Sequence, residues 1–234
     1  MLNPSGDSLL GLQDSLRVII RGKNSPNDLH FQYVSTLYSA LLGRTVDPQG
    51  SEFWANLIIQ GVTRSVVALG IEYSPEGRIA LVQNLYQTYL QRAVDLLGLQ
   101  GSLNFLGLGG TVEQLKAIII DSQEYFQNRA GGTKGGFLAA VYRDVLGRTV
   151  DPVGALIFGQ ALAVGVSRFT IASTLIKSLE AEQIHLESLY LVYLNRPADA
   201  AGAKFFLDAR RVGATDETLL AAILGSDEFF SRIE

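Results

Sequence analysis

One nine-residue motif constrains this chain more than any other feature, because it occurs twice almost unchanged. It reads LGRTVDPQG at residues 42–50 and LGRTVDPVG at residues 146–154. Weaker copies occupy residues 90–98 and 194–202, so the four copies are spaced by 48, 56 and 48 residues. A motif that returns at a nearly fixed interval predicts a fold built from repeated units.

Each interval between copies carries the signals of three helices. Apolar residues at helical spacing predict a first helix over residues 28–42, and a glycine follows it. Asp47 and Pro48 are typical of the start of a second helix, because aspartate accepts free backbone N–H groups and proline loses no hydrogen bond there. A threonine after the next glycine predicts a third helix, and the Ser-Pro-Glu sequence of residues 74–76 begins the following unit. We therefore predict an all-α fold.

A tyrosine, an arginine, an aspartate and a glutamate recur at matching positions in every unit. These positions are Tyr38, Arg44, Asp47 and Glu76; Tyr86, Arg92, Asp95 and Glu124; Tyr142, Arg148, Asp151 and Glu180; and Tyr190, Arg196, Asp199 and Glu228. In a functional interpretation they would bind an ion or a ligand. In a structural one, the aspartate caps a helix, the glutamate lies at a helix start, and the arginine bridges carboxylate and helix-end carbonyls. We favour the structural interpretation, because enzymes seldom need four equal copies of an active site.

The longer middle interval predicts a division of the chain. Residues 130–136, AGGTKGG, have the composition of a flexible linker. We predict an N-terminal arm at residues 1–28 and two tandem helical domains at residues 29–129 and 137–234. Each domain contains two three-helix repeats and a short terminal helix. The second repeat matches the pattern least well, since its second helix contains several glycines.

The combined pattern Tyr-x3-Leu-Gly-Arg-x2-Asp-Pro-x-Gly, Gly-x-Thr/Ser and Ser-Pro-Glu resembles a phycobilisome-linker-like bacterial repeat domain of unknown function. Residues 38–76 carry it most fully, and residues 142–180 and 190–228 carry it well. The resemblance implies an all-helical fold in extracellular, S-layer-like or type I-secreted proteins, often calcium-dependent. It brings no catalytic residues with it.

The composition of the chain bears on whether it binds membranes, nucleic acid or other subunits. Hydrophobic residues make up 47% of the chain and charged residues 18%, yet no apolar run reaches the length of a membrane span. We expect no transmembrane segment, and we expect some of this apolar surface to be buried against other subunits. A net charge of −4 gives no basic surface for nucleic acid. The N-terminus shows no secretory signal peptide.

The residues that catalysis or metal binding would need are sparse. The chain has two histidines and no cysteine, which excludes disulfides and thiolate metal sites. A calcium ion needs six or more oxygens, whereas the Asp47 loop supplies one carboxylate. We expect no cofactor, calcium only if neighbouring segments complete its shell, and no enzymatic activity. Aromatic residues such as Phe53 and Phe205 could stack on sugars but are expected in the core, and Arg210 and Arg211 are expected at a solvated helix end.

Three functions fit these observations. The first is a non-enzymatic structural protein of the bacterial cell surface or extracellular matrix, which self-assembles into a filament or layer through its helical repeats and its arm. In that hypothesis one copy's arm packs where the next domain lacks a repeat. The alternative is a binding module for surface polysaccharide or protein. The third is a phycobilisome-type linker, which would be cytoplasmic, and which the acidic charge disfavours.

Overall fold

The computed structural model describes residues 26–233, and this part of the chain is all α-helical, without a β-strand. Its elements are α1 (Pro26–Leu42), α2 (Pro48–Ile59), α3 (Arg64–Glu72), α4 (Pro75–Leu90), α5 (Leu96–Gly107), α6 (Val112–Asp121), the π-helix η1 (Tyr125–Arg129), α7 (Lys134–Leu146), α8 (Pro152–Ala163), α9 (Arg168–Ile176), α10 (Leu179–Leu194), α11 (Ala200–Arg211), α12 (Asp216–Leu224) and α13 (Asp227–Ser231). The predicted fold class is confirmed. The predicted arm lies outside the described residues, except that α1 begins at Pro26.

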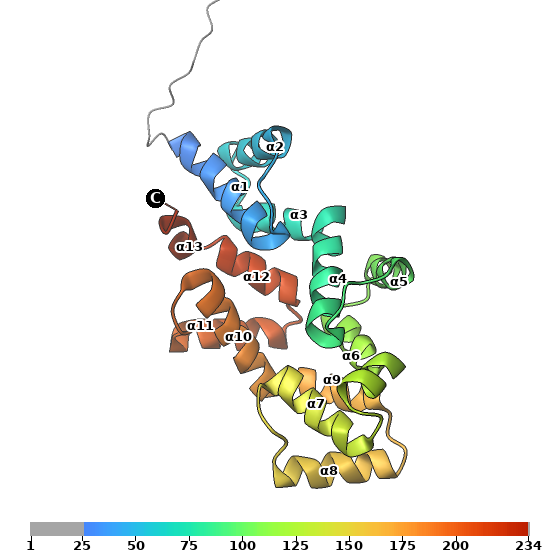
Figure 1. Cartoon of the computed structure of the whole chain (residues 1–234). Coiled ribbons are helices and arrows are strands. Elements are labelled where there is room, and N and C mark those ends of the chain that lie inside the picture. The colour runs from blue at the N-terminus through green and yellow to red at the C-terminus, as the bar shows by residue number, and fades with distance from the viewer. Residues whose placement is uncertain (1–25, 234) are drawn as a thin grey trace, which may run out of the picture.

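The helices bury their apolar faces in two hydrophobic clusters, which define two lobes (Figure 1). The central lobe contains α4 to α9 with η1, and Ala181 at the start of α10 also packs into it. The terminal lobe combines α1 to α3 with α10 to α13. This grouping differs from the predicted division at residues 130–136, because α3 packs on α12 and α6 packs on α9. These four are the third helices of their units, and the order of the units in the sequence does not determine which third helices pack on each other.

The same arginine–phenylalanine contact, called here the joint, occurs in both lobes. In the terminal lobe it connects α3 with α13, and in the central lobe it connects η1 with α9. In the terminal lobe the guanidinium carbon of Arg64 in α3 lies 4.3 Å from the ring centre of Phe230 in α13. In the central lobe that of Arg168 in α9 lies 4.3 Å from the ring centre of Phe126 in η1. Helices of the first unit therefore pack on the last unit of the same chain. The expectation that another copy's arm packs beside a domain concerns residues that lie outside the described ones.

Tyr33 seals the joint between the two ends. Its side chain is fully buried, and its hydroxyl donates to the Leu224 carbonyl oxygen at 3.1 Å. Its ring meets those of Phe229 and Phe230 edge-on, with centroids 6.2 and 5.7 Å apart. Residues 191 positions apart in sequence are thus packed together.

The segment expected to be a flexible linker is a hydrogen-bonded turn. The Ala130 side chain is buried, and its N–H donates to the Tyr125 carbonyl at 3.2 Å. The Gly132 N–H donates to the Phe126 carbonyl at 2.8 Å. The turn therefore holds η1 against α7, and its composition reflects the conformation of a tight turn.

Shortening Phe229 tests the joint between the chain's ends. Phe229→Ala should lower the free energy of unfolding by about 3 kcal/mol, because it leaves a cavity beneath Tyr33. Amide hydrogen exchange should accelerate in α1 and α3, far away in sequence, more than in α7 and α9. The control is Phe205→Ala, whose side chain is 60% exposed, and which should change stability by less than about 1 kcal/mol. Unchanged protection in α1 would contradict the joint.

Candidate functional site

The recurring charged residues meet at four corners, one between the first and second helices of each unit. In the second corner, Arg92 forks onto Glu124, with Nε to Oε1 at 2.5 Å and the second guanidinium nitrogen to Oε2 at 2.7 Å. The same two-pronged pairs join Arg44 to Glu76, Arg148 to Glu180, and Arg196 to Glu228. In each corner the arginine also donates to the carbonyl of the next residue. A planar guanidinium matches a carboxylate in this geometry and fixes its orientation.

The remaining recurring residues complete the same corner. The aspartate accepts from the backbone N–H of the glycine three residues later, at 2.7 to 2.9 Å, and so caps the second helix. The arginine lies over the tyrosine ring, with 4.9 to 5.3 Å between guanidinium carbon and ring centre. That tyrosine's hydroxyl packs against the same glycine, where an added Cβ would come within 2.8 Å of it. Tyrosine and glycine therefore recur together, because the tyrosine hydroxyl occupies the space that a side chain at the glycine position would fill.

The backbone of the corner is also the same where the sequence differs. The residue that ends the first helix has a left-handed conformation in all four units, with φ of 65° at Gly43 and 64° at Gly147. Gln91 and Asn195 adopt it at φ of 56° and 48°, although side chains disfavour that region. The corner's hydrogen bonds thus impose the turn even without glycine.

The electrostatics of the corners match a structural role. Hydrogen bonds from the arginines lower the pKa of Glu76, Glu124, Glu180 and Glu228. Backbone hydrogen bonds from the glycines lower the pKa of the four aspartates. Their stabilising contribution is present at neutral pH and is lost as pH falls through these lowered values. The arginine, aspartate and glutamate of each corner already pair with one another or with the backbone, which leaves little charge for a ligand to bind.

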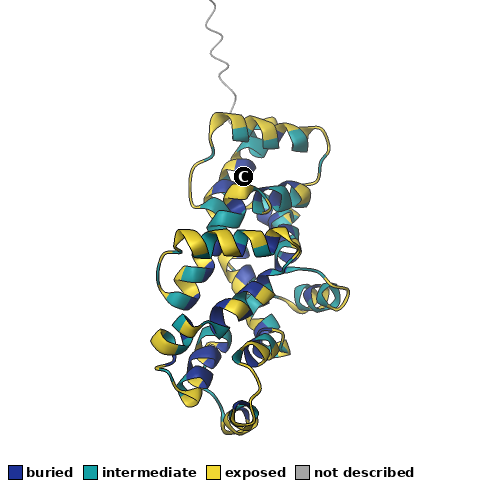
Figure 2. Cartoon of the chain, turned by 90° about the vertical axis from the view of Figure 1, so that its right-hand side faces the viewer, coloured by how far each residue is buried: buried dark blue, intermediate teal, exposed yellow. Residues whose placement is uncertain are grey.

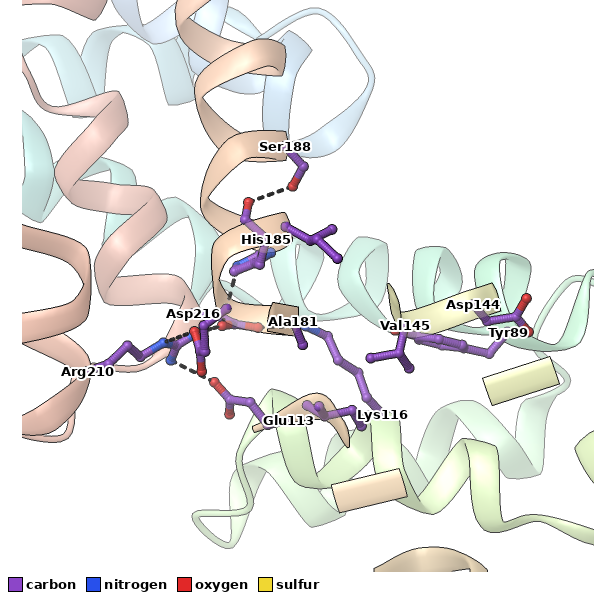
Figure 3. A pocket seen from close by; sticks show the side chains of 13 residues that line it. Tyr89, Glu113, Lys116, Asp144, Val145, Ala181, His185, Ser188, Arg210 and Asp216 are labelled. Atoms are coloured by element: carbon purple, nitrogen blue, oxygen red, sulfur yellow. Dashed lines mark hydrogen bonds and ion pairs between the residues drawn. The ribbon is translucent and has the colours of Figure 1, made fainter. Parts of the chain in front are cut away.

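A second cluster of charges lies where the two lobes meet, in a cavity of about 160 Å³ (Figure 3). Arg210 of α11 is its hub. Its Nε donates to Glu182 of α10 at 2.9 Å, its NH1 nitrogen donates to Glu113 of α6 at 2.9 Å, and its NH2 nitrogen donates to Asp216 of α12. Lys116 of α6 donates to the other oxygen of Asp216 at 2.7 Å. The cluster joins α6 of the central lobe to three helices outside it.

The histidine of this cavity is not arranged for proton transfer to a nucleophile. Burial, then Lys116 and Arg210, lower the pKa of His185 to about 4, so its imidazole is neutral at pH 7. Its Nε2 lies 3.4 Å from Asp216, without a hydrogen bond. Ser188 Oγ donates to the His185 backbone carbonyl, not to the ring. A serine–histidine–acid relay is therefore not formed here.

Two of the second helices, α5 and α8, carry highly exposed apolar side chains. No residue of α8 is charged, and Val153, Leu156, Ile157 and Val164 are 56 to 82% exposed at helical spacing. No residue of α5 is charged either, and Leu97 and Leu108 are 80% and 91% exposed. Each corner holds its second helix with one face on the lobe and the other outward, and in Figure 2 exposed residues follow these outer helices. Contiguous exposed apolar surface of this kind marks interaction sites.

Some aromatic residues expected in the core lie outside it. Phe206 is buried, and Trp54 is half-buried against the terminal-lobe cluster. Phe53 and Phe205, however, are 57% and 60% exposed, because they lie on the outward sides of α2 and α11. The expectation that these two residues are core was wrong.

Sequence reasoning missed the charge cluster and the apolar outer faces. Arg210 was expected to be solvated like its neighbour, but its side chain is 14% exposed, whereas that of Arg211 is 77% exposed. Nothing local distinguishes the two arginines. The outer face of α8 did leave a signal, since twelve residues without a charge are apolar on more than one side.

The comparisons with known proteins are sparse. Residues 23–80 match the model of a domain of unknown function (DUF4214). The match covers a minority of the chain and contains the complete first corner, from Tyr38 to Glu76. No curated protein and no solved structure matches.

Residues 26–233 have neither a membrane-spanning helix nor a metal-binding cluster. Within that range no helix has the length and apolar character of a membrane span. The same residues contain no group of three histidine, cysteine, aspartate or glutamate side chains placed to hold a metal ion.

Removing the hub of the charge cluster tests its role in joining the lobes. Arg210→Ala should lower the free energy of unfolding by about 3–5 kcal/mol, because it leaves three carboxylates close together without their shared cation. Denaturant unfolding followed by circular dichroism measures this. Arg211→Ala is the matched control and should cost less than about 0.5 kcal/mol. Equal effects of the two substitutions would contradict the assigned role.

Proposed function

We propose that this protein is a non-enzymatic structural component of the bacterial cell surface or extracellular matrix, which assembles with copies of itself through the outer faces of α5 and α8. The single observation that carries the proposal is the uncharged, exposed apolar face of α8. Leaving these side chains in water is unfavourable, and burying one leucine or isoleucine contributes about 1.5–3 kcal/mol.

A second copy is the occupant that this chemistry favours. A face without charges is self-complementary, because two copies related by a twofold axis meet without like-charge repulsion. Helix α8 offers Leu156 and Ile157 at its middle, so that two antiparallel copies would pack these residues against each other.

Two such faces on one chain allow assembly beyond a dimer. Helices α5 and α8 lie on different sides of the central lobe (Figure 1). A copy paired through α8 keeps its α5 face free for a third copy, and repetition of the two contacts builds a filament or layer. Assembly through these lateral faces leaves the packing of α3 on α12 within each chain intact.

The location is proposed from the sequence motif. The Tyr-Arg-Asp-Glu units resemble repeats of extracellular bacterial proteins, and the corners use these residues for folding, which agrees with a scaffold. The unreactive arrangement of His185 and Ser188 likewise supports a role without catalysis.

A surface polysaccharide-binding module is the second candidate. The exposed rings of Phe53 and Phe205 favour it, since aromatic faces stack on sugars. Saturable glycan binding by a monomer, abolished by Phe53→Ala with Phe205→Ala, would replace the leading proposal.

Charged substitutions on the two faces test self-assembly. Ile157→Lys on α8 and Leu97→Lys on α5 should each stop assembly at dimers, and the double variant should be monomeric, because lysine places an unpaired charge in an apolar contact. Analytical ultracentrifugation of the full chain measures the species.

The control for these variants is Val192→Lys on α10, at a side chain 70% exposed. It removes a similar apolar group away from both faces and should assemble like the wild type. A wild-type chain that stays monomeric at about 100 μM, or a double variant that still polymerises, rules the proposal out.

A further inference from the structure

An apolar cavity of about 340 Å³ lies between the two lobes, apart from the charge cluster and from the outer faces. Leu41 of α1 and Leu220 of α12 line it from the terminal lobe, and Leu81 of α4 and Leu106 of α5 line it from the central lobe. Its volume falls within the range of about 300–1,000 Å³ that is typical of small-molecule sites. Such sites combine apolar walls with a few convergent polar groups.

Two of the polar groups of this cavity are glutamates that form no ion pair among the described residues. Glu72, at the end of α3, and Glu217, in the first turn of α12, both line it. The Oε1 atom of Glu72 is fully buried and has no hydrogen-bond partner. A buried acceptor without a partner is costly, and native structures normally satisfy it through a protein group, water or a ligand.

The same cavity contains two tyrosines and one arginine. Tyr193 of α10 and Tyr73 line it, and aromatic rings are among the groups that bind organic cations. Arg78 of α4 also lines the cavity, and its guanidinium carbon lies 5.4 Å from the ring centre of Tyr73. Arg78 forms no ion pair with either glutamate among the described residues.

We propose that this cavity binds a primary ammonium group carried on an apolar chain, with Glu72 as its main hydrogen-bond acceptor and Glu217 as the second carboxylate. The ammonium supplies the donors that Glu72 lacks, and the apolar chain lies against the four leucines. Tyr193 adds an aromatic face for the cation.

The ionisation of Glu72 agrees with a site that lacks its cation. Burial, and then the neighbouring carboxylate of Glu217, raise the pKa of Glu72 to about 9. The unliganded glutamate is therefore protonated at pH 7. Binding of an ammonium forms a charged pair there and releases a proton to the buffer.

The probes that test the proposal are hexylammonium, 1-hexanol and hexanoate, titrated calorimetrically into the full chain at pH 7. Hexylammonium should bind at one site per chain, at least about tenfold more tightly than 1-hexanol, because a charged hydrogen bond is lost with the alcohol. Hexanoate should not bind measurably. Equal affinity for hexylammonium and 1-hexanol would show an apolar cavity without cation selectivity and would overturn the proposal.

Two variants assign the binding to Glu72. Glu72→Gln should weaken hexylammonium binding at least about tenfold while leaving 1-hexanol binding unchanged. Glu52→Gln, at an exposed glutamate of α2, should bind like the wild type. Retained hexylammonium affinity in Glu72→Gln would overturn the assignment.

Proton release provides a readout on the wild-type chain alone. Calorimetry in phosphate and in Tris should show close to one proton released for each hexylammonium bound and none for 1-hexanol. Hexylammonium binding without proton release would contradict the buried pairing with Glu72. None of these measurements depends on self-assembly, so the two proposals fail separately.

Discussion

The arginine–glutamate fork is the interaction on which this structure depends most. Each fork joins a corner to the start of the helix that follows the unit's third helix, 32 residues later in the chain. That helix is the long α4 or α10 in two units and the short η1 or α13 in the other two. The second and third helices of a unit lie between its two partners, so the fork closes those helices into a loop of fixed shape. Aspartate, tyrosine and glycine then set the direction in which the second helix leaves. The arginine–glutamate fork at the surface thereby fixes which apolar face of the second helix packs on a lobe and which faces solvent.

Because the four units are alike, their sequences do not determine which units pack together. In this chain the third helices form two pairs, and both pairs pack in the same way. Helix α6 packs on α9, and α3 packs on α12, with the same arginine-over-phenylalanine contact at each joint. The seam between the lobes gathers the polar groups that neither core can bury. On one side Arg210 donates to three carboxylates, and on another the Oε1 atom of Glu72 lacks a hydrogen-bond partner. The charge cluster, whose carboxylates have partners within the chain, holds the lobes together. The cavity of Glu72, where an acceptor has no partner, is instead a candidate binding site.

The sequence predicts the helices well because their start signals are local. Asp47 with Pro48, and Ser74 with Pro75, cap their helices as expected. Helix α5 also forms in full despite Gly101 inside it, because Leu106 is buried against the central lobe and packing outweighs propensity. One expected cap is different, since the Thr63 side chain makes no hydrogen bond to the backbone of α3.

What the sequence does not predict depends on contacts between distant residues. The order of the units does not reveal that α3 meets α12, because either partner would bury the same apolar face. Arg210 and Arg211 are neighbours with the same chemistry, and contacts with residues of α6, α10 and α12 bury only Arg210. Glu72 looks like a common helix-end glutamate in the sequence, but in the fold it lines a cavity together with residues of α1, α4, α10 and α12.

The most direct test of the account is a double-mutant cycle on the fork between Arg92 and Glu124, using Arg92→Ala, Glu124→Ala and the double variant. Urea unfolding at pH 7 should give a coupling free energy of about 1 kcal/mol, the upper range for a partly exposed pair with two-pronged geometry. The coupling should weaken as the pH falls through the pKa of Glu124, which the hydrogen bond from Arg92 lowers, because protonation removes the charge of the carboxylate. Additive effects of the two substitutions at pH 7 would mean that the corners do not hold the fold together, and the account would be contradicted.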